Sequence, residues 1–299
     1  MGTLIERSIQ LTIQNSPVSH VNGSVTEFDV ADGLPGSDAV SAYHRDGVVC
    51  LRAAYDAGWL SLIEEGIDLA LSGRSEDLDI VRKPGDSGQF SFSSQAWRQV
   101  EPFRQFIFES RAPDLAWPFL DSTVLTLFYD FLLIKEAGAV SAKTPWHQDQ
   151  AYYPLHGTQV INCWTALDPI PIQTALQFWK GSHAERRVYQ AVDFAGESDY
   201  RHLQSHRSPP PDIDRQPAAD ILTTELAPGD MLVWNSCTFH SAPGNTLDRR
   251  RAAFSINWVG DGVTFHDIPS LQTYRADGLT EGMHINCDKF PVVRKRESS

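Results

Sequence analysis

The sequence predicts a mainly β fold, a sandwich or barrel of short strands with helices packed on its outside. From residue 122 onward the apolar runs are short, β-branched or aromatic, and bounded by turn residues, which is typical of strands. Before that point, apolar residues recur at helical spacing. Many short strands in one chain favour a two-layered or closed β architecture.

The expected strands cover residues 124–135, 146–152, 158–167, 175–179, 221–226, 230–234 and 250–259. Upstream, a short helix begins at Ser37 and ends before Gly47, and a buried strand follows it. A second helix fits residues 56–72, with Asp56 as its N-cap. Prolines punctuate further helical segments over residues 97–120.

The length of 299 residues suits one large domain. A long charged stretch with few apolar pairs is expected to be a lid loop rather than part of the core. We expect an N-terminal extension (1–36), a single domain (37–290) and a C-terminal tail (291–299). Within the domain, a helical part (37–121) precedes a jelly-roll core (122–262), and the core contains the lid loop (184–220).

The composition excludes several classes of partner. A formal net charge of -13 disfavours binding to nucleic acid or to anionic membrane. No stretch approaches the roughly 18 uncharged apolar residues of a membrane span, and the N-terminus has no export-signal pattern. The cysteines lie far apart without a CxxC pair. We therefore expect a cytoplasmic protein that acts on a small molecule; its oligomeric state is open.

The segment TPWHQDQAYYP carries the sharpest chemical signal. His147 and Asp149 stand two positions apart, so on a strand their side chains share one face and can share one metal ion. His-x-Asp alone is common and therefore weak evidence. A third ligand is available in His240, which lies in a small-residue stretch after a predicted strand.

Two histidines and one carboxylate form a facial triad that leaves coordination positions open, as in non-haem Fe(II) oxygenases. Zinc more often takes a closed tetrahedral set, or three ligands plus water. The open positions would accept 2-oxoglutarate and O2. Arg251 can then pair with the distal carboxylate of 2-oxoglutarate, and Ser255, on the same strand face, can add a hydrogen bond.

The chain resembles the phytanoyl-CoA dioxygenase-like (PhyH) family of Fe(II)/2-oxoglutarate-dependent oxygenases over roughly residues 40–262. The matching stretches are WHQDQAYYP, CWTALDPI, TALQFWKGSH, PGDMLVWNSCTFHSAPGN and RRRAAFSINW. The resemblance implies a double-stranded β-helix, a cupin-like jelly-roll, with iron on His147, Asp149 and His240. It also implies that Arg251 and Ser255 hold 2-oxoglutarate, that Trp164 lines the co-substrate pocket, and that Lys135 lies near it.

Aromatic and amide residues near the motifs are candidates for contact with substrate, although such residues on strands more often belong to the core. These candidates are Gln150, Tyr152, Tyr153 and Trp258. The other histidines, His156, His183, His202, His206 and His266, are expected to be surface or structural residues.

The sequence therefore predicts a dioxygenase that hydroxylates a C–H bond of a small metabolite or natural-product intermediate and releases succinate and CO2. Asp149 argues against a halogenase of this fold, in which a small residue takes that position. Two alternatives stay open: a cupin-like metal protein with non-oxidative chemistry, and a non-catalytic binding protein on the same scaffold. Desaturation, epoxidation and cyclisation fit the same site residues.

Overall fold

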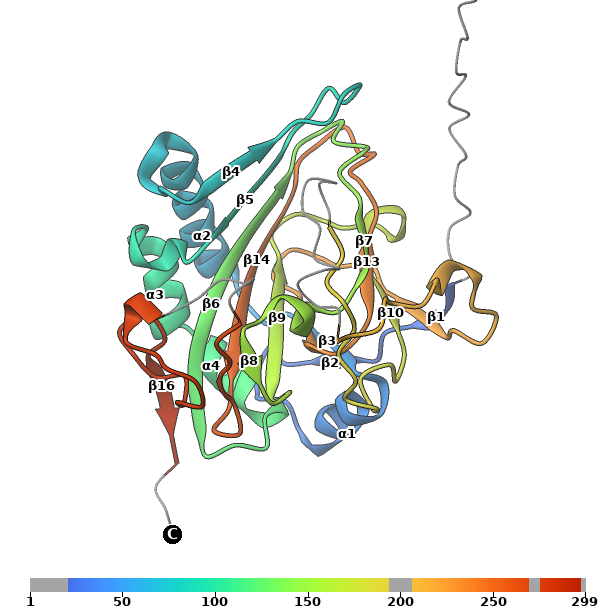
Figure 1. The fold of residues 1–299 in the computed structure, drawn as a ribbon. Helices are drawn as coiled ribbons and strands as arrows, with labels where there is room; N and C mark the ends of the chain where they lie inside the picture. Colours follow the sequence, from blue (N-terminus) through green and yellow to red (C-terminus); the bar gives the residue numbers. More distant parts are fainter. Residues whose placement is uncertain (1–20, 194–205, 269–274, 297–299) are drawn as a thin grey trace, which may run out of the picture.

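Two facing β-sheets dominate the structure, a computed structural model that describes residues 21–193, 206–268 and 275–296 (Figure 1). The large sheet runs in the order β2 (Glu27–Asp29), β3 (Val48–Arg52), β12 (Met231–Asn235), β9 (Val160–Ala166), β14 (Arg251–Val259), β6 (Val124–Lys135), β5 (Phe90–Ser94) and β4 (Leu78–Val81), and β16 (Val292–Lys295) also pairs with β6. The small sheet runs in the order β1 (Val21–Ser24), β11 (Ile221–Thr223), β10 (Gln177–Trp179), β13 (His240–Ala242) and β7 (Thr144–His147). A short ladder joins β8 (Leu155–His156) to β15 (Thr264–Phe265).

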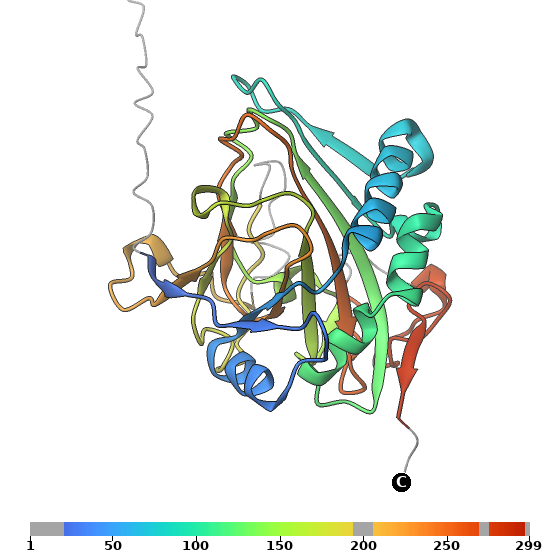
Figure 2. The same ribbon diagram turned by 180° about the vertical axis from the view of Figure 1, so that it is seen from behind.

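Helices cover the outer face of the large sheet, as the view from behind shows (Figure 2). The α-helices are α1 (Ser37–Asp46), α2 (Ala57–Leu69), α3 (Glu101–Glu109) and α4 (Ala112–Ala116). Short turns of other helix types are η1 (Ala70–Arg74), η2 (Ala96–Arg98), η3 (Trp117–Phe119), η4 (Asp149–Tyr152), η5 (Ile172–Thr174), η6 (Ile213–Arg215) and η7 (Arg275–Asp277).

Aromatic packing joins the helices to the sheet. Phe103 of α3 stacks on Phe254 of β14 with ring centroids 4.6 Å apart, and Phe106 meets the same ring edge-on. Gly66 of α2 allows this arrangement, because a Cβ there would lie 2.4 Å from the Phe103 ring. The helical layer therefore fixes the large sheet from outside and leaves its inner face to the small sheet.

Alternation along β14 divides its side chains between two environments. Ala252, Phe254 and Ile256 belong to the core under the helices, whereas Arg251 and Ser255 line an internal pocket. Successive side chains of a strand point to opposite faces, so one strand supplies both the core and the pocket.

The expected mainly β fold with helices outside it, a double-stranded β-helix, is confirmed. The strand over 124–135 is β6, end to end. The first helix ends at Gly47, which has a φ of 84° and caps the helix in the left-handed region. Asp56 caps α2 by accepting hydrogen bonds from the backbone N–H groups of Gly58 and Trp59.

Both expected terminal segments contribute strands, which corrects their description as an extension and a tail. Within 1–36, β1 pairs in parallel with β11, and β2 pairs in parallel with β3. Within 291–299, β16 pairs with β6. Sheet edges expose unpaired backbone groups, and these segments satisfy them. Residues 1–20 and 297–299 lie outside the described part of the chain.

The expected lid, residues 184–220, is described except for 194–205. Its described flanks are tied to the segment that follows β7. Gln148 donates to the Arg187 carbonyl at 3.0 Å and accepts from the Tyr189 N–H at 3.0 Å, and Arg207 donates to the Ala151 carbonyl at 3.0 Å. The covering role of this segment stays a prediction. Among the described residues, none of the helices has the length and apolarity that a bilayer crossing requires.

Candidate metal centre and co-substrate pocket

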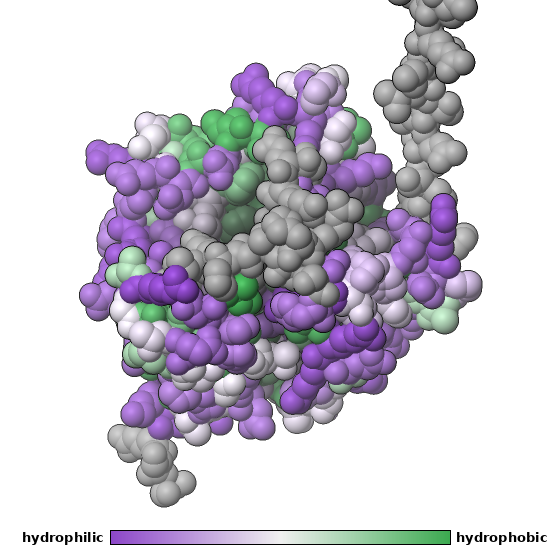
Figure 3. All heavy atoms as spheres, viewed as in Figure 1, coloured by the Kyte–Doolittle hydropathy of each residue, from purple (hydrophilic) through white to green (hydrophobic). Residues whose placement is uncertain are grey.

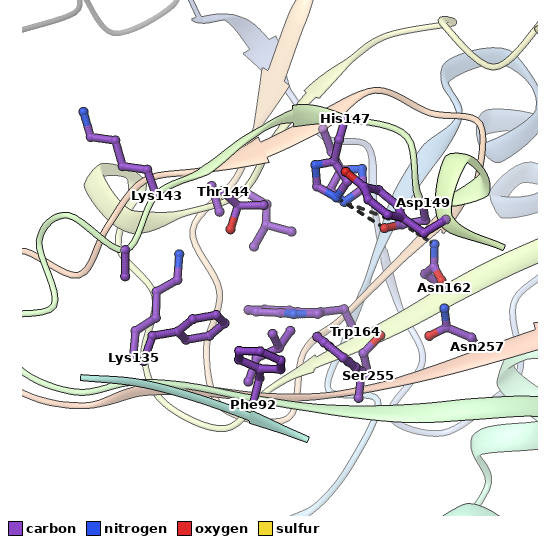
Figure 4. Close-up of a pocket in the computed structure, with 18 of the residues that line it drawn as sticks. Phe92, Lys135, Lys143, Thr144, His147, Asp149, Asn162, Trp164, Ser255 and Asn257 are labelled. Atoms are coloured by element: carbon purple, nitrogen blue, oxygen red, sulfur yellow. Dashed lines mark hydrogen bonds and ion pairs between the residues drawn. The ribbon is translucent and has the colours of Figure 1, made fainter. Parts of the chain in front are cut away.

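A pocket of about 390 Å³ lies between the two sheets. On the face of the molecule seen in Figure 1, the space-filling view shows hydrophobic residues gathered around a hollow (Figure 3). His147 and Asp149 lie at one end of the pocket and Lys135 at the other, with Trp164 and Ser255 between them (Figure 4). The pocket therefore has a polar centre at one end and a basic group at the other.

The two histidines face each other on neighbouring strands. His147 of β7 and His240 of β13 are direct partners in the antiparallel ladder, and their ring centroids are 4.1 Å apart. The Nδ1 of His147 lies 2.8 Å from the Pro145 carbonyl, and that of His240 lies 3.1 Å from the Thr238 carbonyl. A carbonyl only accepts, so in the neutral form of both rings the proton is on Nδ1 and Nε2 presents a lone pair.

Asp149 completes a triangle with these rings. Its Oδ1 lies 3.4 Å from Nε2 of His147, and its Oδ2 lies 3.6 Å from Nε2 of His240. Asp149 does not extend β7, as the sequence predicted, but opens the 3-10 turn η4. The turn is held by a hydrogen bond from the Gln150 N–H to the Ser236 carbonyl at 3.0 Å. The side chains of His147 and Asp149 therefore come together because of this turn, and not because they alternate along one strand.

Two donors fix the carboxylate of Asp149. The side-chain amide of Asn162 donates to Oδ2 at 2.6 Å, and the indole N–H of Trp234 donates to the same oxygen at 2.9 Å. Burial alone would raise the pKa of Asp149, but His240, His147 and the Trp234 indole outweigh it and lower the pKa. Neither Asn162 nor Trp234 was among the residues predicted for the site.

The donor set suits a ferrous ion. Burial lowers the pKa of His240 to about 4 against the opposing effect of Asp149, so this imidazole is neutral and able to bind a metal at neutral pH. The ligand atoms of His147, Asp149 and His240 lie within 4.8 Å of one another. Two imidazoles and one carboxylate leave coordination positions for further ligands, as in non-haem iron centres.

Arg251 supplies the cation of the pocket. It is 5% exposed, and its Nε and one terminal nitrogen have no hydrogen-bond partner among the described residues. Burial lowers its pKa to about 10, so the guanidinium keeps its charge at neutral pH. A buried, charged fork without partners is costly unless a ligand fills it, and a carboxylate matches it in shape and charge.

The other residues predicted to bind the co-substrate surround Arg251. The guanidinium carbon lies 5.6 Å from the centroid of the Trp164 ring, and Ser255 lies opposite Trp164 in the ladder between β14 and β9. Lys135 also lines the pocket and donates to the Pro243 carbonyl at 3.0 Å. The structure thus brings together Arg251, Ser255, Trp164 and Lys135 in one cavity with the His-Asp-His cluster.

Aromatic residues form much of the remaining wall. Tyr152 and Tyr153 line the pocket as predicted, and so do Phe90 and Phe92 of β5, which the sequence interpretation missed. The alternating FSFSS stretch was the available signal, since it places both phenylalanines on one face. Asn257 also lines the pocket and donates to the Tyr153 hydroxyl.

Two candidates for substrate contact are corrected by their positions. Trp258 is fully buried in the core beneath the helices, because its parity on β14 is opposite to that of Arg251. Gln150 does not line the pocket. Its amide donates to the Gly157 carbonyl at 3.1 Å and accepts from the Ser236 hydroxyl at 2.7 Å, so it holds the η4 turn in place.

Known proteins resemble this chain at the level of family and fold. The profile of the phytanoyl-CoA dioxygenase (PhyH) family matches residues 43–253, whereas no curated protein matches the chain. Among solved structures, the carbocyclase SnoK from nogalamycin biosynthesis, described as non-heme and alpha-ketoglutarate-dependent, has a TM-score of 0.69 at 21% identity and covers 91% of this chain and 100% of its own.

Two further structures were solved with ligands. The epimerase SnoN in complex with Fe3+, alpha-ketoglutarate and nogalamycin RO has a TM-score of 0.63 at 23% identity, covering 85% of this chain and 97% of its own. EvdO2 from Micromonospora carbonacea var. aurantiaca, complexed with 2-oxoglutarate, has a TM-score of 0.58 at 19% identity, covering 81% and 98%. At these identities the likeness establishes the fold.

Proposed function

This chain belongs to the phytanoyl-CoA dioxygenase family, and we propose that it is a non-haem Fe(II)- and 2-oxoglutarate-dependent dioxygenase. In the proposed reaction, 2-oxoglutarate, O2 and a substrate C–H bond give succinate, CO2 and a hydroxylated product. The substrate is a small metabolite or a natural-product intermediate.

The observation that carries this proposal is the buried Arg251 guanidinium in the same pocket as the three candidate ligands. A facial triad alone is compatible with several metal chemistries. A buried cation that shares the pocket with the metal ligands, and has two nitrogens without a hydrogen-bond partner among the described residues, suits an acid with a second, distant carboxylate. 2-Oxoglutarate has this form, because one end can chelate iron while the other pairs with arginine.

In this assignment His147, Asp149 and His240 hold Fe(II), and Arg251 and Ser255 hold the tail of 2-oxoglutarate. When bound, iron with 2-oxoglutarate and O2 supplies the oxidising equivalents that C–H cleavage requires. The chain itself fixes the geometry: backbone carbonyls orient both imidazoles, and Asn162 with Trp234 orients the carboxylate.

The walls of the pocket protect the reaction. Trp164 lies beside the guanidinium, and both side chains are buried, which limits the water that reaches the charge. Tyr152 is held by the Val192 backbone, since its hydroxyl donates to the carbonyl at 2.6 Å and accepts from the N–H at 2.9 Å. A dry, rigid site strengthens the ion pair with the co-substrate and reduces side reactions.

The first test is an anaerobic titration of the metal-free protein with Fe(II) and 2-oxoglutarate. Chelation should give a weak visible charge-transfer band, and Arg251→Met should require far more 2-oxoglutarate to reach it. A wild-type protein that develops no band under these conditions refutes the proposal. Admission of O2 with a panel of small molecules, scored by succinate release, then identifies the substrate class.

The same assay separates the two alternatives. A metal protein with non-oxidative chemistry would turn over substrate without O2 and without 2-oxoglutarate. A non-catalytic binding protein would bind ligand and release no succinate. Analysis of the product then distinguishes hydroxylation from desaturation, epoxidation, cyclisation or epimerisation.

A further inference from the structure

A second cluster of metal-binding groups lies outside the pocket. His156, His266 and Glu281 place one ligand atom each within 4.8 Å of one another, and none of them lines the pocket. Nε2 of His156 is 2.6 Å from one Glu281 oxygen, and Nδ1 of His266 is 3.3 Å from the other. The two imidazole centroids are 3.9 Å apart.

The backbone places both histidines on one side of the same ladder. His156 of β8 is the direct partner of Thr264 of β15. His266 follows Thr264 by two positions, so its side chain returns to the same face. The His266 N–H donates to the Pro154 carbonyl at 2.9 Å, which continues the pairing past the end of β15.

Glu281 is held against this ladder by three hydrogen bonds. Its carboxylate accepts from the Asp267 N–H at 2.6 Å. The neighbouring Gly282 N–H donates to the Phe265 carbonyl at 2.9 Å, and the Phe265 N–H donates to the Met283 carbonyl at 2.7 Å. The Glu281 carboxylate is therefore already held beside both imidazoles, and these three groups could bind a metal ion without a large rearrangement of the backbone.

A buried hydrophobic core supports the cluster. Leu155 and Phe265, adjacent to the two histidines, are buried in a core shared with Leu279 and Ile285. Sites built on packed elements hold their ligands more accurately than sites on loops. This buried core thus fixes the segments that carry the three ligands, while the ligand atoms face the surface.

An ion pair between Glu281 and protonated imidazoles is the competing explanation. Such a pair would bring two like-charged rings, with centroids 3.9 Å apart, against one exposed carboxylate, and exposed ion pairs contribute little to stability. Neutral imidazoles beside a carboxylate present two nitrogen donors and one oxygen donor. Zn²⁺ accepts three such ligands plus water, whereas Mg²⁺ and Ca²⁺ prefer oxygen alone.

We propose that His156, His266 and Glu281 form a second, surface site for a divalent transition-metal ion such as Zn²⁺, with water completing the coordination. The bound ion ties the segment around Glu281 to the β8–β15 ladder. The proposal departs from the expectation that His156 and His266 are only surface residues, and it does not depend on the proposed function of the pocket.

Calorimetric titration of the metal-free full chain with Zn²⁺ at neutral pH tests the site. The wild type should bind two equivalents, because the pocket ligands also accept Zn²⁺. The variant His147→Ala/His240→Ala isolates the surface site and should bind one. Adding His266→Ala should abolish that binding, and adding Glu281→Gln should weaken it by about tenfold or more.

His284→Ala on the same background is the matched control, since His284 is exposed and its backbone pairs with Thr264, but it is not part of the cluster. It should leave the Zn²⁺ affinity unchanged. Circular dichroism confirms that each variant is folded. If the background variant binds no Zn²⁺, or if His266→Ala and Glu281→Gln bind it as tightly as the background, the proposal is overturned.

Discussion

Arg251 and Lys135 lie directly opposite each other on the antiparallel strands β14 and β6, and both line the pocket. Burial and the charge of Arg251 hold the pKa of Lys135 well below its usual range. The Lys135 amine donates to the Pro243 carbonyl. Arg251, two of whose nitrogens have no hydrogen-bond partner among the described residues, therefore remains the group at this end of the pocket that can pair with a carboxylate.

Replacing Arg251 by Lys should weaken 2-oxoglutarate binding by about 30- to 150-fold, or roughly 2–3 kcal/mol. Lysine keeps a charge but cannot form the two parallel hydrogen bonds that a guanidinium makes with a carboxylate. The 2-oxoglutarate dependence of the anaerobic charge-transfer band measures the change.

Arg250→Lys is the matched control for that substitution. Arg250 is the preceding residue but pairs with Glu136 at 2.8 Å, outside the pocket. Its replacement should leave the 2-oxoglutarate affinity within about twofold, because an exposed ion pair contributes little. Equal losses in both variants would show that general destabilisation, and not the pocket, caused the effect.

Asn162→Leu should weaken Fe(II) binding by about 10- to 100-fold. Asn162 makes the shorter of the two hydrogen bonds to Oδ2 of Asp149, and its loss frees the carboxylate to rotate. Competition with a fluorescent chelator measures the affinity for Fe(II) independently of turnover.

Asn257→Leu provides the comparison for Asn162. Asn257 donates to the Tyr153 hydroxyl, which in turn donates to Asn162, so it stands one step further from the carboxylate. We expect a smaller loss of metal affinity than in Asn162→Leu. Wild-type affinity in Asn162→Leu would contradict a positioning role for this amide.

Local patterns predicted much of the site. Alternation on β14 correctly grouped Arg251 with Ser255, since strand parity depends only on neighbouring residues. The same parity places Trp258 on the opposite face, where it packs under the helices. Alternation along the strand therefore already predicts that Trp258 does not line the pocket. His147 and Asp149 were identified together although a turn, not a strand, joins them.

Non-local pairing supplied what the sequence could not. Asn162 of β9 and Trp234 of β12 reach Asp149 because the facing sheets bring these strands beneath η4. The order of strands within a sheet depends on contacts between residues far apart in the chain, which a periodicity does not encode. For the same reason, β1, β2 and β16 could not be recognised as edge partners.

Gly66→Ala should destabilise the protein by about 1–2 kcal/mol, although alanine is the better helix former by up to about 1 kcal/mol. The added Cβ would lie 2.4 Å from the ring of Phe103, which is fully buried and stacked on Phe254. Urea denaturation measures the change. Gly33→Ala is the control, because a Cβ there meets no atom within 4 Å; a neutral Gly66→Ala would mean that the α2–α3 contact is loose.

Asp130 should make stability fall as the pH rises. This carboxyl group is completely buried beside η2, and burial raises its pKa from 3.8 to about 7, despite hydrogen bonds from backbone N–H groups such as that of Trp97. Between these pH values the folded chain keeps the proton that the unfolded chain releases, so the unfolded state is favoured as the pH rises. The free energy of unfolding should drop by up to about 1.4 kcal/mol per pH unit, for a total of about 4 kcal/mol.

Asp130→Asn isolates this contribution, because the amide has nearly the same shape and does not titrate. Its free energy of unfolding, measured in urea at pH 5, 6, 7 and 8, should lack the part of the slope that Asp130 causes. The wild type should therefore lose stability relative to the variant up to about pH 7, with little further difference above it. Parallel curves for the two proteins across this range would show that Asp130 has the same proton affinity in the folded and unfolded chains.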